Sequence, residues 1–112
     1  AARVALAAKS QGKYWDVHRA LLAIDGRVDG KSAMAAAEKL GLDMAKLKAD
    51  MTSDDVNGEI SSVRELAQKM GINGTPHFLV GERTIAGAPE DLLEQFKTNV
   101  ADIRKNGGCK VC

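Results

Sequence analysis

The 112-residue sequence is poor in aromatic residues, proline and cysteine, and it has almost no net charge. Because aromatic side chains make up only 4% of the residues, base stacking gives no basis for nucleic-acid binding. Sixteen basic and fifteen acidic side chains leave a net charge of +1, which gives no argument for a nucleic-acid partner or for an acidic one. No apolar run approaches the ~18 residues that a membrane-spanning helix needs.

The composition is otherwise that of an ordinary globular protein, with 45% hydrophobic and 28% charged residues. The chain length suits one domain with a modest core. The apolar run at residues 4–8, between Arg3 and Lys9, is too short for the hydrophobic region of a secretory signal.

Most of the chain has apolar residues spaced three and four apart, which predicts amphipathic helices. Helices are predicted over residues 1–11, 13–24 and 31–40, and a short one follows a predicted cap at Asp43. The longest helix begins at residues 53–55, and a last helix follows Pro89. The predicted buried stripe of the longest helix comprises Val56, Ile60, Val63, Ala67 and Met70, and that of the last helix Leu92, Leu93, Phe96, Val100 and Ile103.

A loop rich in glycine, asparagine and proline interrupts this helical pattern at residues 71–76. Pro76 biases Thr75 toward an extended conformation, and it suits the first position of a strand because it lacks an N–H. Two short runs of strand character follow, at residues 77–80 and 83–86, around the turn residue Gly81. The sequence therefore predicts one β-hairpin.

This order of segments resembles the C-terminal part of a thioredoxin fold and, more narrowly, the DsbA-like thiol–disulfide oxidoreductases of the bacterial cell envelope. Gly74-Thr75-Pro76 before an apolar strand, a second strand with Gly87, and an amphipathic last helix carry the resemblance. The helical segments upstream resemble that family's helical insertion, and the resemblance spans residues 1–104. It implies an α/β, thioredoxin-like fold with a helical insertion, of which this chain supplies mostly helices and one β-hairpin.

We expect three parts: a helical insertion subdomain at residues 1–70, the C-terminal half of the thioredoxin fold at residues 71–106, and a flexible cysteine-containing tail at residues 107–112. The resemblance implies that the family's first strand and its Cys-x-x-Cys precede Ala1. The chain is therefore expected to be the later part of a longer protein.

The resemblance also implies that the pair Thr75-Pro76 binds the backbone of a client polypeptide, with a cis bond between them that faces the active-site disulfide. Such a bond is physically reasonable because X–Pro bonds tolerate the cis form. The alternative is an ordinary proline in the loop that leads into a strand.

Cys109-Lys110-Val111-Cys112 has the spacing of a redox dithiol or of half a zinc site. A redox pair normally opens a helix whose N–H groups stabilise the thiolate, and no residue follows Cys112 here. We therefore interpret the pair first as a passive tail, second as a disulfide within or between chains, and last as a metal site. Cys109 and Cys112 are thus weak candidates for catalysis, and no metal site or cofactor is predicted.

Both histidines are predicted to be structural. His77 is expected to be partly covered because it shares a strand face with Leu79. His18 is expected to be a packed, hydrogen-bonded core histidine beside Trp15 and Leu22.

The resemblance implies a protein disulfide oxidoreductase or isomerase in the periplasm or cell envelope, whose partners are cysteine-containing clients and a redox partner protein. The 112-residue chain by itself is expected to have little activity. The alternative is a non-catalytic thioredoxin-like module for binding or assembly, in which Cys109 and Cys112 form a cross-link or bind metal.

The predicted strand at residues 77–80 would have one edge without a partner strand in this chain. Phe78, Leu79 and the apolar faces of the first and last helices are expected to stay partly uncovered. A homodimer through this edge is therefore a further expectation.

Overall fold

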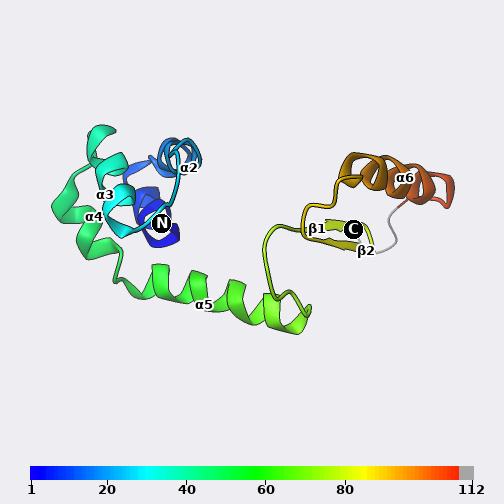
Figure 1. Ribbon diagram of the computed structural model, residues 1–112. Helices are drawn as coiled ribbons and strands as arrows, with labels where there is room; N and C mark the ends of the chain where they lie inside the picture. The colour runs from blue at the N-terminus through cyan, green and yellow to red at the C-terminus, as the bar shows by residue number, and fades with distance from the viewer. Residues whose placement is uncertain (109–112) are drawn as a thin grey trace. The chain divides into compact units, whose positions relative to one another are not determined.

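The computed structural model describes residues 1–108, and the predicted pair Cys109 and Cys112 lies outside the described residues (Figure 1). The chain divides into two compact units, residues 1–66 and a second unit that begins at Ala67. Its elements, in chain order, are α1 (Ala2–Ala7), the 3-10 helix η1 (Ala8–Gln11), α2 (Tyr14–Leu22), α3 (Gly30–Lys39), α4 (Met44–Asp50), α5 (Asp54–Lys69), β1 (His77–Val80), β2 (Arg83–Ala86) and α6 (Leu92–Lys105).

Aspartate caps start two helices of the first unit. The carboxylate of Asp43 accepts hydrogen bonds from the main-chain N–H groups of Ala45 and Lys46, as predicted for the start of α4. At the start of α3, Asp29 accepts from the N–H of Ser32 at 2.8 Å, and the Ser32 hydroxyl accepts from the N–H of Asp29 at 3.0 Å. This reciprocal pair satisfies two main-chain donors.

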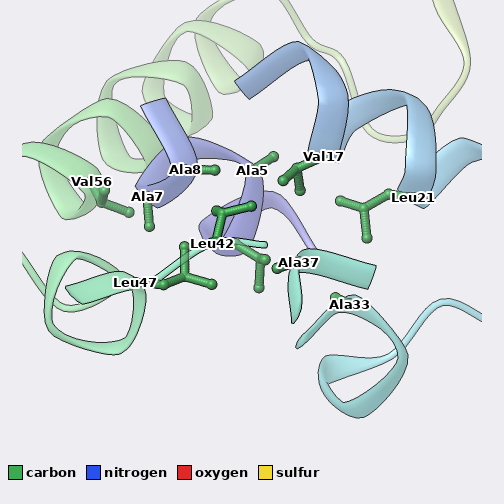
Figure 2. Close-up of a cluster of buried hydrophobic side chains, with 11 residues drawn as sticks. Ala5, Ala7, Ala8, Val17, Leu21, Ala33, Ala37, Leu42, Leu47 and Val56 are labelled. Carbon is green, nitrogen blue, oxygen red and sulfur yellow. The ribbon is translucent and has the colours of Figure 1, made fainter. Parts of the chain in front are cut away.

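The core of the first unit forms around α1 and η1 (Figure 2). Small alanine side chains on these helices allow neighbouring segments to approach closely. The expectation that the apolar face of the first helix stays partly uncovered is wrong for Val4, Ala5 and Ala7, which are core members, whereas Leu6 is only partly buried. The buried residues are Val4, Ala5, Ala7, Ala8, Val17, Leu21, Ala33, Ala37, Leu42, Leu47 and Val56.

The buried stripe predicted for α5 is wrong beyond its first turns. Val56 is buried and Ile60 packs against the core, but Val63 is 61% exposed and Met70 is 42% exposed. The helical period determines which side chains share a face. Burial also requires another segment to pack against that face. Among the described residues, the core packs against α5 only near Val56 and Ile60.

The second unit contains the hairpin and α6. Strands β1 and β2 pair antiparallel in a register that places Phe78 opposite Ile85, and their bounds confirm the predicted hairpin. The ring of Phe78 contacts that of Phe96 on α6 edge to face, with centroids 5.1 Å apart. On β2, the guanidinium of Arg83 donates to Asn99 on the same helix at 2.8 Å.

The predicted apolar face of α6 is only half-buried. Leu93 departs furthest from the prediction, being 63% exposed, and no residue of α6 is fully buried. Its half-buried apolar residues are Leu92, Phe96, Val100 and Ile103.

Candidate functional site

The loop between α5 and β1 contains the predicted client-binding pair. Thr75 and Pro76 are both exposed, and the peptide bond between them is cis. The carbonyl of Pro76 accepts a 2.8 Å hydrogen bond from the main-chain N–H of Gly87, directly after β2. Gly87 has a φ of +74°, which favours glycine because other residues seldom adopt positive φ. The loop is therefore attached to both strands of the hairpin.

A hollow of about 250 Å³ lies along this loop. Thr75, Pro76 and Gly87 all contribute to its wall, so the predicted pair and the hairpin end belong to one surface feature. The complete lining is Gly71, Asn73, Gly74, Thr75, Pro76, His77, Ala86 and Gly87.

His77, the first residue of β1, also lines this hollow. Its side chain is half-buried, as predicted, but its Nε2 atom is fully buried and has no hydrogen-bond partner within residues 1–108. A buried polar atom without a partner costs about 1–3 kcal/mol. Sequence reasoning missed this atom, and its one available signal was the position of His77 directly after Pro76.

The core position predicted for His18 is wrong. Its imidazole is half-buried and stacks on Tyr14, with ring centroids 5.9 Å apart. Its predicted neighbours Trp15 and Leu22 are 63% and 75% exposed. The reason is that α2 directs Val17 into the core, so the face that carries His18 lies at its margin.

A second polar cluster lies in the first unit, where Asp50 accepts hydrogen bonds from Lys46 at 2.8 Å and from the Ser10 hydroxyl. The Lys46 bond, followed by the Ser10 bond, holds the pKa of the Asp50 carboxyl below its ordinary value. At the cap of α3, main-chain and hydroxyl hydrogen bonds from Ser32 likewise lower the pKa of Asp29. These contacts join or start helices, and we assign them no catalytic role.

Within residues 1–108, no group of three histidine, cysteine, aspartate or glutamate side chains is arranged to hold a metal ion. The helices of this part of the chain include none that is long and apolar enough to cross a membrane.

Comparison with a solved structure gives a clear structural relative. The chain matches a thioredoxin-like oxidoreductase from Silicibacter pomeroyi DSS-3 with a TM-score of 0.78 and 38% sequence identity. The match covers 93% of this chain and 59% of that one.

Two curated relatives are much longer proteins. The Na(+)/H(+) antiporter NhaA 3 of Salinispora tropica is 31% identical over 83 residues, which are 74% of this chain and 13% of that protein. The Na(+)/H(+) antiporter NhaA 1 of Salinispora arenicola is 31% identical over 90 residues, which are 79% of this chain and 14% of that protein. The chain thus spans a small part of these relatives.

A family model gives the assignment. The model of the DSBA-like thioredoxin domain matches residues 1–101, which include all of the first unit, the Thr75-Pro76 loop and the hairpin. The chain therefore belongs to the DSBA-like thioredoxin domain family and has a thioredoxin-like fold, mostly helical with a two-stranded antiparallel hairpin.

Proposed function

We propose that the protein carries out thiol–disulfide exchange with cysteine-containing client polypeptides, and that Thr75 and Pro76 face the client. The observation that carries the proposal is the exposed Thr75-Pro76 loop, which borders a hollow in a domain of the DSBA-like thioredoxin family. The name of the structural relative, a thioredoxin-like oxidoreductase, supports the same chemistry.

The exchange proceeds in two displacements. A client thiolate attacks one sulfur of the protein's disulfide, forming a mixed disulfide and releasing the other sulfur as a thiolate. A second client thiolate then attacks the client sulfur of the mixed disulfide, which forms the client disulfide and leaves the protein pair reduced. Two electrons pass from client to protein, and the reverse sequence reduces a client disulfide. Isomerisation exchanges one client disulfide for another and transfers no net electrons.

The reactive sulfur pair has to come from outside the part of the chain that the structure describes, because residues 1–108 contain no cysteine. We place it outside residues 1–112, since the chain spans 59% of the related oxidoreductase. Cys109 and Cys112 are weaker candidates, because both lie beyond residue 101, where the match to the family model ends.

The role of Thr75 and Pro76 is to position the client. An extended peptide binds an exposed main-chain edge through its own N–H and C=O groups, so recognition is largely independent of the client's sequence. The hollow of about 250 Å³ is smaller than the ~300–1,000 Å³ of typical small-molecule sites. Its size suits one or two residues of a polypeptide.

A covalent-trapping experiment tests the proposal. The oxidised intact protein is incubated with a fluorescent peptide that contains one cysteine, because such a peptide forms the mixed disulfide but no disulfide within itself. Acid then quenches the reaction, so that the released protein thiolate does not displace the peptide. We expect an adduct of one peptide mass that dithiothreitol releases. The same peptide with serine in place of cysteine is the control. Failure to form the cysteine-dependent adduct would contradict the proposal.

We place this exchange in the periplasm or cell envelope, where disulfides persist. The sequence resemblance to oxidoreductases of that compartment supports the placement. A redox partner protein would restore the oxidised pair after each turnover. A second copy of the chain is a further proposed partner, through the edge of β1 that β2 does not occupy.

A non-catalytic binding or assembly module is the second candidate function. The observation that favours it is the similarity to 13–14% of two proteins named as Na(+)/H(+) antiporters, where the matching region is one part of a larger protein. In this alternative, Cys109 and Cys112 would cross-link chains or bind metal. The trapping experiment separates the two candidates when it is repeated with Cys109→Ser and Cys112→Ser in the intact protein. An adduct that persists forms at another sulfur pair and supports exchange, whereas loss of the adduct supports the alternative.

A further inference from the structure

The unpaired nitrogen of His77 lies at the site of the proposed client. His77 lines the hollow together with Thr75 and Pro76, and its Nε2 is the one fully buried side-chain nitrogen or oxygen of residues 1–108 without a hydrogen-bond partner. Buried polar atoms in native proteins nearly always have partners, and an exception calls for a functional explanation or an additional binding group.

The geometry of β1 separates His77 from α6. Phe78 contacts Phe96 of that helix, and neighbouring side chains of a strand point to opposite faces. The side chains of His77 and Leu79 therefore belong to the other face of β1, where Leu79 is 52% exposed. Within residues 1–108, this face is covered around the Nε2 atom of His77 and open at Leu79.

We propose that His77 is a client-binding residue whose Nε2 forms a hydrogen bond with the main chain of an extended polypeptide bound at Thr75-Pro76. This inference rests on the proposed function and adds a side chain to its client site. A neutral imidazole offers either a donor or an acceptor at Nε2, according to its tautomer. A peptide main chain offers both kinds of group, so it satisfies this nitrogen in either form.

The client can reach Nε2 only if the imidazole turns, because this atom is fully buried in the free protein. Thr75 and Pro76 are exposed, and the imidazole as a whole is half-buried. The terminal side-chain torsion of histidine has a broad energy profile, and no hydrogen bond from residues 1–108 restrains Nε2. A bound main chain can thus draw the nitrogen toward the hollow without breaking an existing bond.

The proposal predicts effects of opposite sign on stability and on client binding. His77→Leu removes a buried atom that has no partner in the free protein, so the melting temperature should stay the same or rise. The same change removes the hydrogen bond to the client, so binding should weaken. His77→Gln keeps an amide that can donate or accept, and it should restore binding.

The test uses the intact protein and a fluorescent peptide with two cysteines, with glutathione disulfide as the oxidant. We expect His77→Leu to raise KM for the peptide about tenfold, the equivalent of one hydrogen bond, with kcat within about twofold of wild type. His77→Gln should bring KM back to within about threefold of wild type. His18→Leu is the matched control, because His18 stacks on Tyr14 and does not line the hollow. The KM of this variant should be unchanged.

Each contrary result has a definite meaning. An unchanged KM in His77→Leu overturns the client-binding role. A loss of kcat with unchanged KM also overturns it, because that result assigns the imidazole to the sulfur exchange instead. A lower melting temperature with unchanged KM makes His77 structural and also overturns it. A wild-type protein without exchange activity overturns the proposed function together with this inference. An active protein whose KM is unchanged by His77→Leu overturns the inference alone.

Discussion

The main-chain N–H of Gly87 donates a 2.8 Å hydrogen bond to the carbonyl of Pro76. This bond joins the residue before β1 to the residue after β2, where His77 pairs with Ala86 in the antiparallel register. The proposed client-binding loop is therefore held by the end of the hairpin. Its position depends on Gly87, which the sequence places only at the end of the second predicted strand.

Gly87→Ala should lower the free energy of unfolding by about 1 kcal/mol, because the residue has a φ of +74° that an L side chain adopts at a cost. A Cβ atom at this position would meet no atom within 4 Å, so the cost comes from the backbone conformation. Gly74→Ala in the same loop is the matched control, since Gly74 has no positive φ and equally open space, and it should not destabilise. Urea denaturation of both variants makes the comparison, and equal stabilities would contradict the explanation.

The edge-to-face contact between Phe78 and Phe96 should contribute measurable coupling. The two ring planes lie 87° apart, and such pairs contribute about 0.5–1.5 kcal/mol beyond the area they bury. In a double-mutant cycle with Phe78→Leu and Phe96→Leu, the double variant should lose about 1 kcal/mol less than the sum of the single losses. Additive losses would show that the two rings act independently.

The stability of the chain should fall at acidic pH in part through Asp50. Its folded-state pKa is lowered, first by Lys46 and then by Ser10, so this contribution is present above the ordinary carboxyl pKa of about 3.9. It is lost as the pH falls below that value through the folded-state pKa. Asp50→Asn should therefore show a smaller decrease in melting temperature between pH 7 and pH 3 than wild type. An identical decrease would exclude a role for this carboxylate.

Local chemistry made much of the fold predictable. Pro76 precedes the first strand of the hairpin and Gly81 follows it. Both strands lie at the predicted residues, because turn residues and a short apolar run are local signals. Asp43 likewise caps α4 as predicted. The resemblance to the DsbA-like family, which rested on the order of these segments, is confirmed by the family match over residues 1–101.

Burial was less predictable, because it depends on contacts between distant segments. Periodicity identified an apolar face on α5, yet Val63 is 61% exposed because a helical period does not specify what covers the face. Helical periodicity also predicted a core position for His18, whose side chain is half-buried. The unpaired Nε2 of His77 also escaped prediction, since sequence does not indicate which buried atoms find partners.

The free edge of β1 should promote self-association of the 112-residue chain. In the part of the chain that the structure describes, β1 pairs only with β2, and Leu79 on β1 is 52% exposed. An unpaired strand beside exposed apolar side chains favours pairing with a second copy. Sedimentation over a concentration series should show dimers, and Leu79→Lys should weaken them. A monomer at the highest concentration would exclude association through this edge.

The most direct test of the account measures peptide oxidation by the intact protein when the client-binding loop is altered. Pro76→Ala gives this loop residue a wider range of φ and an added N–H. The main chain that binds the client is then no longer held in one conformation. Pro89→Ala changes the only other proline, which lies outside the hollow, and serves as the matched control. We predict that Pro76→Ala lowers kcat/KM for the two-cysteine peptide at least about tenfold, equivalent to about 1.4 kcal/mol, while Pro89→Ala stays near wild type. Equal activity of the two variants would contradict the claim that Thr75-Pro76 positions the client.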